Sequence, residues 1–274
     1  EKEITLFHAK AVNQILKKTK ANVNFIGFHG QTIYHNAKER ISKQLGDGRL
    51  LSKITKKTVI CDFRQNDLKN GGHGAPLAPI FHKVLSEKFN LSKKNTAIFV
   101  NIGGISNLTR LTSFYTIYSK DCGPGMCLID KWIRTKSKNK IDKDGKIAKK
   151  GSIDHKILKK YINQIDYFRK DAGINSFDVN DFKLFLVKKM SLEDGAATLT
   201  EFSAKNILMQ VCDLATERTN LILCGGGRKN KFLVLRMKKL IKDFFNAEGL
   251  INLTMIDDLG VDGDFVESQA FAFL

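Results

Sequence analysis

Two short apolar runs, each ending in consecutive glycines, constrain the fold of this chain more than any other feature. Residues 97–102 (Ala-Ile-Phe-Val-Asn-Ile) run into two glycines, and residues 220–224 (Asn-Leu-Ile-Leu-Cys) run into three. Nearly continuous apolar runs of this length are typical of strands that are covered on both faces. A glycine-rich turn at the carboxyl end of such a strand lets backbone N–H groups approach an anion, and phosphate is the usual one.

Either glycine turn alone is equally compatible with a plain tight turn. Neither matches the G-x-x-x-x-G-K-[ST] loop or the G-x-G-x-x-G fingerprint of known nucleotide-binding motifs. Two such turns in one chain favour a split nucleotide site, in which separate loops hold separate parts of the nucleotide.

The remaining hydrophobic periodicity alternates between the helical and the extended pattern. Strands are expected over residues 23–28, 58–63, 97–102 and 220–224, and helices over residues 4–18, 152–164, 199–217, 231–245 and 265–274. Strands that alternate with helices predict an α/β fold.

The chain is strongly basic, with 46 Lys and Arg against 28 Asp and Glu, a formal charge of +18. The densest stretch, residues 131–150, contains only one aromatic side chain, Trp132, whereas nucleic-acid sites usually interleave basic and aromatic residues. We therefore expect this stretch to be a solvated loop and expect no nucleic-acid partner. No apolar run approaches the roughly 18 residues of a membrane span, so no membrane partner is expected either.

The five cysteines are odd in number and widely spaced. This pattern argues against a disulfide framework and against a four-cysteine zinc site. A reducing, cytoplasmic environment fits best.

Asp121 stands just ahead of a rigid turn, Gly-Pro-Gly at residues 123–125, after which a helix is expected to begin. A carboxylate held by a stiff turn has the fixed position that a general base needs. The same residue in the same place is equally well explained as a helix cap or turn former. The residues alone leave both readings open.

Three further places could face a ligand. His29 and Gln31, separated by one glycine after a predicted strand, could both hydrogen-bond a polyol, although a satisfied turn histidine is the commoner case. The loop at residues 71–79 has little side-chain bulk and is either a ligand platform or a plain connector. Glu267 falls in the first turns of the last helix, where a solvated glutamate is the simpler reading.

Taken together, these segments resemble the anhydro-N-acetylmuramic acid kinase family, over essentially the whole chain. The most specific matches are Asn-Ile-Gly-Gly-Ile-Ser-Asn at residues 101–107 and Asp-x-Gly-Pro-Gly at residues 121–125. The other matching segments are residues 29–32, 61–67, 71–79 with 81–82, 108–109, 126–132, 142–145, 225–230 and 262–274.

The resemblance implies two RNase H-like domains of the actin-like ATPase fold, with ATP and Mg²⁺ in the cleft between them. The first domain would comprise residues 1–95 and 255–274 on the sugar side, and the second residues 96–254 with the phosphate and adenosine loops. We expect Asp121 and both glycine turns to meet at this one cleft.

The resemblance also implies roles for particular residues. Asp121 would be the catalytic base, and no residue is assigned to the metal. The sugar would be bound by His29, Gln31, Ala75, Pro76 and Glu267. The nucleotide would be bound by Asn101, Gly103, Gly104, Gly225, Gly226 and Gly227.

The family's reaction opens the 1,6-anhydro bridge of 1,6-anhydro-N-acetylmuramic acid with water and transfers the γ-phosphoryl group of ATP to O6. The product, N-acetylmuramic acid 6-phosphate, belongs to peptidoglycan recycling, and the family suggests a homodimer.

Two alternative functions remain open. One is a phosphotransferase of the same fold with another sugar or acid as acceptor. The other is a non-catalytic nucleotide-binding remnant whose basic surface binds nucleic acid.

The sequence departs from the family pattern in two ways. His73 stands where the family usually has Gln, which leaves one hydrogen-bond donor but changes its position. The family's first phosphate loop, Gly-Thr-x-Ser-Gly-Thr-Ser-x-Asp-Gly, has no counterpart. We therefore expect a fragment cut at both ends, with an incomplete first domain, that is inactive or nearly so by itself.

Overall fold

The computed structural model describes residues 1–93, 95–112, 116–170, 177–216, 218–243 and 245–274. The chain divides into two compact units, Glu1–Phe81 with Glu267–Leu274, and His82–Val266. Residues 82–95 and 255–266, which the sequence placed with the first domain, lie in the second unit by their contacts. Which unit binds sugar and which binds nucleotide stays a prediction.

The first unit combines small sheets with short helices. Strand β1 (Phe25–Gly27) pairs in parallel with β4 (Thr58–Ile60), and β2 (Gln31–Asn36) forms an antiparallel hairpin with β3 (Ile41–Leu45). The helices are α1 (Lys2–Thr19), α2 (Gly48–Thr55), α3 (Gln65–Lys69), the start of α4 (Ala78–Lys88) and most of α9 (Val266–Phe273).

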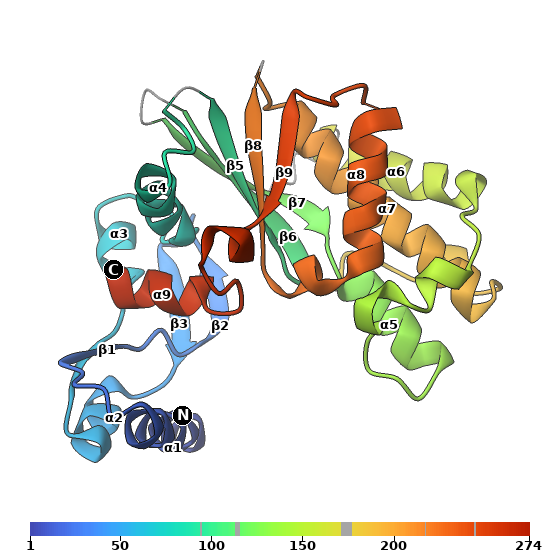
Figure 1. The fold of residues 1–274 in the computed structure, drawn as a ribbon. Helices are drawn as coiled ribbons and strands as arrows, with labels where there is room; N and C mark the ends of the chain where they lie inside the picture. Colours follow the sequence, from blue (N-terminus) through green and yellow to red (C-terminus); the bar gives the residue numbers. More distant parts are fainter. Residues whose placement is uncertain (94, 113–115, 171–176, 217, 244) are drawn as a thin grey trace. The chain divides into compact units, whose positions relative to one another are not determined.

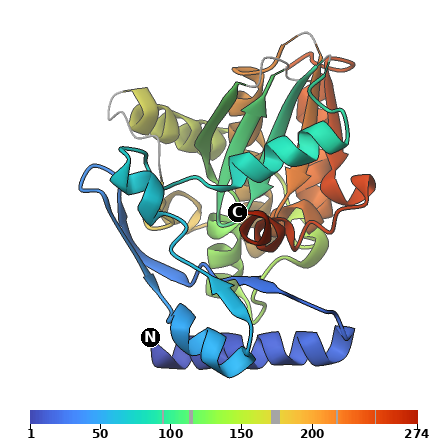
Figure 2. The ribbon, with the colours of Figure 1, turned by 90° about the vertical axis from the view of Figure 1, so that its left-hand side faces the viewer.

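Helices α1 and α2 lie side by side in the first unit (Figure 2). Asp47 caps α2 by accepting a hydrogen bond from the Leu50 N–H at 2.9 Å, as an Asp at this position commonly does. Leu51 and Ala9 meet Phe28 in a small apolar cluster, which fixes the pair of helices against the backbone that follows β1.

The second unit is built on a five-stranded sheet in the order β7-β6-β5-β8-β9 (Figure 1). Its strands are β5 (Thr96–Ile102), β6 (Ile105–Leu111), β7 (Ile117–Pro124), β8 (Thr219–Cys224) and β9 (Ile251–Met255). The first three form an antiparallel meander, and β8 and β9 continue the sheet in parallel to β5. This is the strand arrangement of an RNase H-like domain, and the predicted α/β class is confirmed.

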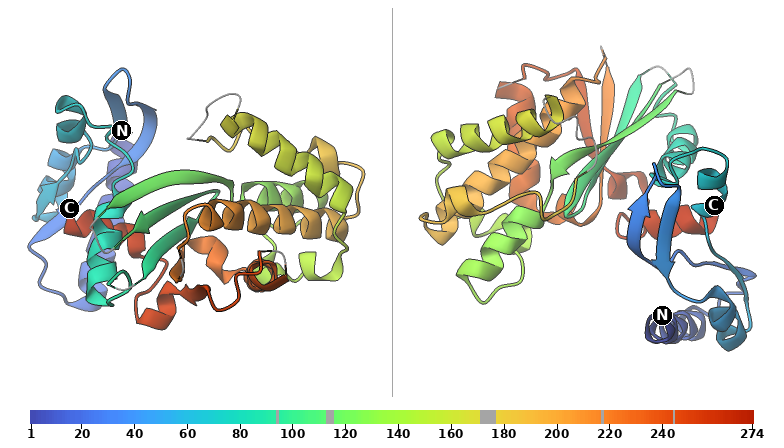
Figure 3. Two further views of the ribbon diagram at one scale, coloured as in Figure 1. Left: turned by 90° about the horizontal axis from the view of Figure 1, so that it is seen from above. Right: turned by 180° about the vertical axis from the view of Figure 1, so that it is seen from behind.

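The sheet is accompanied by α5 (Cys127–Lys136), α6 (His155–Lys170), α7 (Leu192–Cys212), α8 (Lys231–Asp243) and the part of α4 that begins at His82. Helices α7 and α8 cover one face of the sheet (Figure 3), where Val100, Leu223 and Ile207 belong to one buried cluster. On the other face, the His82 ring of α4 stacks on Phe99 with ring centroids 4.7 Å apart. Strands covered on both faces account for the apolar runs in the sequence.

Most predicted elements are present with shifted ends. The helix expected over residues 199–217 begins earlier, at Leu192, because Ser191 caps it by accepting from the Asp194 N–H at 3.1 Å. Glu217 and Phe244, at the ends of two predicted helices, lie outside the described residues. In the described part of the chain, no helix is both long and apolar enough to cross a membrane.

Candidate active site

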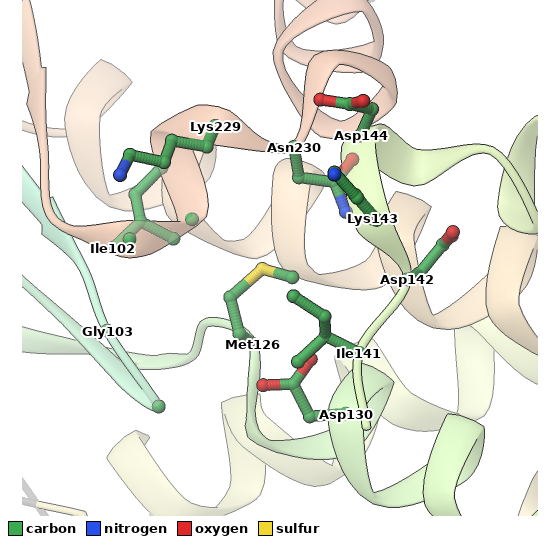
Figure 4. Close-up of a pocket in the computed structure, with 13 residues that line it drawn as sticks. Ile102, Gly103, Met126, Asp130, Ile141, Asp142, Lys143, Asp144, Lys229 and Asn230 are labelled. Carbon is green, nitrogen blue, oxygen red and sulfur yellow. The ribbon is translucent and has the colours of Figure 1, made fainter. Parts of the chain in front are cut away.

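The two glycine turns line the same cavity, about 730 Å³ in volume, in the second unit (Figure 4). Gly103 and Gly104 enter it from the end of β5, and Gly226 and Gly227 enter it from the end of β8. These strands are parallel neighbours, with Asn101 paired to Cys224, so their carboxyl ends lie at the same edge of the sheet. Segments far apart in the sequence therefore share one cavity, because the parallel pairing of β5 with β8 brings their ends together.

The first turn is the connection of the β5–β6 hairpin, and the Gly-Pro-Gly segment is bound to it. The Gly125 N–H donates to the Gly104 carbonyl at 2.9 Å, and the Met126 N–H donates to the Gly103 carbonyl at 2.8 Å. Helix α5 begins at Cys127, directly after this contact, as predicted. These two hydrogen bonds bring Met126 and the first turn of α5 to the cavity.

The second turn packs on the end of β5. Gly225 has φ +77°, and a Cβ there would collide with Asn101 Oδ1. A Cβ at Gly227 would collide with the side chain of Ile102. Glycine is therefore required at both positions for the two turns to approach each other.

Arg228 anchors the second turn to the segment after β9. Its guanidinium is buried and donates to the Gly225 carbonyl at 2.9 Å, to Asp257 Oδ2 at 2.6 Å and to Asp264 Oδ1 at 2.8 Å. The hydrogen bond from Arg228 lowers the pKa of Asp257 to about 2. Charge-assisted hydrogen bonds of this kind are among the stronger polar contacts, so the turn is held rigidly.

One wall of the cavity comes from the basic stretch that the sequence predicted to be a solvated loop. That prediction is wrong. Residues 131–136 belong to helix α5, where Trp132 and Ile133 are buried, and Asp142 is buried in the second half and organises it. Asp142 Oδ1 accepts from the Ile147 N–H at 2.8 Å, and Oδ2 accepts from the Ala148 N–H at 2.9 Å. Two 3₁₀ helices result, Lys143–Gly145 and Ala148–Lys150, and Asp142 also lines the cavity.

Asp130 of α5 and Asn230 at the start of α8 also line the cavity, and the sequence analysis assigned a binding role to neither. Asp130 is half-buried, and this burial raises its pKa to about 6. Asn230 is 4% exposed and its Oδ1 accepts from the Leu233 N–H at 3.0 Å, which caps α8. The position of Asn230 before an amphipathic helix was a readable capping signal, but its approach to the cavity was not.

Asp121, the predicted base, lies on β7 outside the lining of this cavity. It pairs with Asn107 of β6, which in turn pairs with Asn101 of β5, so the three side chains form one row across the sheet. The row lies on the face opposite to α7 and α8, since the alternate residue Cys122 packs against those helices. Asp121 Oδ2 accepts from the Phe177 N–H at 3.0 Å. The residue is thus a strand carboxylate and not a helix cap.

The predicted sugar-binding residues lie in the first unit. His29 follows β1, and its ring lies 4.4 Å from that of Phe271 between centroids. Its Nε2 accepts from Arg64 Nε at 3.0 Å, so the ring proton is on Nδ1, which donates to the Gly30 carbonyl at 2.9 Å. Burial, and secondarily the Arg64 charge, lowers the pKa of His29. Gln31 is exposed at the start of β2.

The loop at residues 71–79 is held in place by two side chains that the sequence analysis did not single out. Arg64 Nη1 donates to the Gly74 carbonyl at 2.8 Å, and Asp67 Oδ2 accepts from the Gly74 N–H at 2.6 Å. The loop is therefore more than a plain connector. It carries Ala75 and Pro76, joined by a cis peptide bond.

Glu267 is exposed in the first turn of α9, the place predicted for it. The binding roles of these first-unit residues and of the nucleotide residues stay predictions.

Comparison with known proteins decides the family. Residues 1–274 match the family model described as anhydro-N-acetylmuramic acid kinase. The chain belongs to this family. A protein of this name from Pelagibacter ubique (strain HTCC1062) is 45% identical over 281 residues, which cover 100% of this chain and 72% of that protein. Another from Rhizobium etli is 38% identical over 277 residues, with the same coverage of 100% and 72%.

Solved structures with a similar fold are more distant than these kinases. The activator of the 2-hydroxyisocaproyl-CoA dehydratase from Clostridium difficile with bound ADPNP aligns with a TM-score of 0.42 and 13% identity, over 82% of this chain and 77% of that one. A ROK family protein from Streptococcus pneumoniae TIGR4 in complex with sucrose gives a TM-score of 0.38 at 12% identity, over 97% of this chain and 84% of that one. These scores are too low to bear on the site.

Proposed function

We propose that this member of the kinase family acts in the cytoplasm on 1,6-anhydro-N-acetylmuramic acid. Water opens the anhydro bridge, O6 receives the γ-phosphoryl group of ATP, and N-acetylmuramic acid 6-phosphate is formed for peptidoglycan recycling. The observation that carries the proposal is the shared cavity of the two glycine turns. It supplies two backbone segments at adjacent strand ends, which is how split phosphate and nucleoside loops are built.

The nucleotide is assigned to this cavity. Asn101, Gly103 and Gly104 would face the phosphates, and Gly225, Gly226 and Gly227 would face the adenosine. Gly104 and Gly226 are exposed and present bare backbone to the cavity, so phosphate oxygens at Gly104 and the adenosine at Gly226 could approach without meeting a side chain. In phosphoryl transfer the protein mainly positions the groups and stabilises charge, and backbone dipoles suit that task.

Asp121 is assigned the role of base. It would take a proton from water as the water oxygen attacks the anomeric carbon and the bond from that carbon to O6 breaks. The electron pair left on O6 then forms the bond to the γ-phosphorus, and ADP leaves. The row Asn101–Asn107–Asp121 supports this role, because two strand spacings of about 4.8 Å separate Asp121 from the strand that carries the first glycine turn.

The sugar would contact His29, Gln31, Ala75, Pro76 and Glu267. His29 Nδ1–H and Nε2 are already engaged by Gly30 and Arg64, so its contribution would be a fixed surface and not a proton transfer.

Mg²⁺ would neutralise charge on the β- and γ-phosphates when bound. Among the described residues no three His, Cys, Asp or Glu side chains are grouped to hold a metal. An ion carried by the phosphates and water with little protein ligation fits this chain.

The test is a turnover assay on the protein encoded by the gene that carries this chain, with ATP and the anhydro-sugar, and with the 6-phosphate product measured by mass spectrometry. Asp121→Asn should reduce turnover by about 10²–10⁴-fold and leave ATP affinity unchanged, because it removes only the proton acceptor. A variant that turns over at the wild-type rate would exclude Asp121 as the base.

The acceptor is tested by the same assay with other sugars. Efficient phosphorylation of a sugar without an anhydro bridge, at the expense of the anhydro-sugar, would favour the alternative phosphotransferase. Run on the 274 residues by themselves, the assay also tests the prediction that this chain alone is inactive or nearly so. The proposed homodimer is tested by sedimentation equilibrium.

A further inference from the structure

Two buried side-chain atoms in the cavity lack a hydrogen-bond partner among the described residues, Asp130 Oδ1 and Asn230 Nδ2. A buried polar atom left unpaired costs on the order of 1–3 kcal/mol, so such atoms are rare in folded proteins unless something outside the chain pairs with them. One atom is an acceptor and the other a donor. Both belong to the cavity that we assign to the nucleotide.

The orientation of Asn230 is fixed by its other amide atom. Oδ1 accepts from the Leu233 N–H at 3.0 Å, so the NH₂ group must be the atom on the other side. Gly145 packs against the same oxygen, and a Cβ at Gly145 would collide with it. In Figure 4 the Asn230 nitrogen accordingly faces the interior of the cavity.

The helix cap does not explain why this residue is asparagine. Ser and Asp cap helices as well as Asn does, and both supply the acceptor that the Leu233 N–H needs. What Asn alone adds at position 230 is an N–H donor. The donor faces the cavity and is satisfied by nothing in the described chain.

Asp130 approaches the cavity from the opposite side. It extends from α5 toward Ile141 and Met126, and these apolar side chains lie around it (Figure 4). Arg134 and Asp142 act on its carboxylate through their charges, but neither provides Oδ1 with a hydrogen bond. The carboxylate is thus kept in a partly desolvated place that the fold alone would not favour.

The cavity therefore offers apolar walls, one buried donor, one buried acceptor and a pair of glycine turns. A nucleoside has the matching features: a flat base for the apolar walls, ring nitrogens that accept, and an exocyclic amine and ribose hydroxyls that donate. Asparagine amides are well suited to the ring-nitrogen edge of adenine, and carboxylates to ribose hydroxyls or amines.

We propose that Asn230 and Asp130 recognise the nucleoside of the nucleotide bound in this cavity. Asn230 Nδ2 donates to a ring nitrogen of the base, and Asp130 Oδ1 accepts a hydrogen bond from an amine or a ribose hydroxyl. This inference rests on the proposed function, since it presupposes that the cavity binds a nucleotide.

Asn230→Asp tests the donor, because Asp keeps the cap and removes the N–H. Calorimetric titration with ADP should give a dissociation constant raised tenfold or more, with an unchanged melting temperature in the absence of nucleotide. Asn139→Asp, the same charge change at an exposed position of the same unit, should bind ADP as the wild type does. If Asn230→Asp lowers the melting temperature, Asn230→Ser repeats the test with a neutral cap.

Asp130→Asn tests the acceptor with three nucleotides: ADP, IDP, in which a carbonyl replaces the amine, and 2′-deoxy-ADP. If Asp130 accepts from the amine, the wild type should disfavour IDP and the variant should lose that preference. If Asp130 accepts from the ribose, the wild type should disfavour 2′-deoxy-ADP and the variant should lose that preference.

Two outcomes separate this inference from the proposal it rests on. A wild type that binds no nucleotide overturns both. A wild type that binds ADP, together with Asn230 and Asp130 variants of wild-type affinity and preference, overturns the inference and leaves the proposed function standing.

Discussion

The two glycine turns of the second unit look alike in the sequence and differ in what their glycines do. In the second turn, Gly225 has a left-handed backbone, and both Gly225 and Gly227 lie where a Cβ would collide with the end of β5. In the first turn, Gly104 has only ordinary contacts around the position of a Cβ, the nearest being a Val179 methyl at 3.6 Å. Gly226 has no described atom within 4 Å of that position.

The difference separates glycines that the fold requires from glycines that it does not. Gly225 and Gly227 are explained by close packing, as any tight turn could be. Gly104 and Gly226 are explained neither by backbone conformation nor by packing, yet both line the cavity. A bare backbone that the fold does not require is what a ligand close to the chain would need. The pattern favours a binding site over a plain turn.

The sharpest test of this distinction is Gly225→Ala. The left-handed backbone and the collision with Asn101 should together lower the free energy of unfolding by about 2–4 kcal/mol. Urea denaturation monitored by circular dichroism measures the change. A variant as stable as the wild type would show that the turn can rearrange and that its glycine is not structurally required.

Gly104→Ala and Gly226→Ala should behave in the opposite way. Stability should be unchanged or up to about 1 kcal/mol higher, because the unfolded chain loses freedom and nothing in the fold is displaced. The added methyl group enters the cavity, so ADP should bind roughly tenfold more weakly, equivalent to about 1.4 kcal/mol. Loss of stability together with unchanged ADP affinity would reverse the assignment of the two classes of glycine.

Arg228→Gln tests what holds the second turn. The guanidinium is 4% exposed while Asp257 and Asp264 are 45% and 40% exposed, so water can compensate the carboxylates when the cation is lost. We expect the free energy of unfolding to fall by about 1–2 kcal/mol at pH 7, which is less than for a fully buried ion pair. Lys239→Gln, an equal charge change at an exposed position of α8, should have little effect.

The same variant has a pH signature. The pKa of Asp257 is lowered to about 2 in the folded protein, so the stability it contributes is complete above the ordinary carboxyl pKa near 4. That stability is lost as the pH falls through 2. The difference in free energy of unfolding between wild type and Arg228→Gln should therefore become smaller as the pH falls from 4 to 2. A difference that stays constant would contradict the ion-pair account.

The smallest effect is expected for Asp130→Asn. Burial raises the pKa of Asp130 to about 6, so ionising this carboxylate lowers the free energy of unfolding. The loss grows between pH 4 and pH 6 and reaches its full size above pH 6. Without nucleotide, the variant should be more stable than the wild type by about 1 kcal/mol at pH 7, since partial exposure reduces the cost. Near pH 4 the two should be equal in thermal denaturation, and a variant less stable at pH 7 would refute this.

The sequence predicted those parts of the fold that are set by local patterns. Runs with strong periodicity, such as β5, β8 and α8, were found with ends displaced by one or two residues. Strands β6 and β7 were not predicted, because their mixed polar and apolar residues become a strand pattern only when β5 pairs with β6 and β6 in turn pairs with β7. Tertiary pairing decides such segments, and single-sequence periodicity does not contain it.

The residues of the candidate site also fall into two groups, those that local sequence patterns reveal and those that they do not. The glycine turns and Asp121 stood out because glycine and proline are read locally. Asn230 and Asp130 did not, since an asparagine before a helix and an aspartate inside one are common surface residues. Their importance comes from which atoms are left unpaired in the cavity, and that depends on the packing of Gly145 and Met126 around them.

The central claim, that the two glycine turns together form one nucleotide site, is tested most directly by a crystal structure with a non-hydrolysable ATP analogue. The account predicts phosphate density against Gly103 and Gly104 and nucleoside density between Asn230 and Asp130. An analogue bound elsewhere in the molecule, with this cavity unchanged, would contradict it.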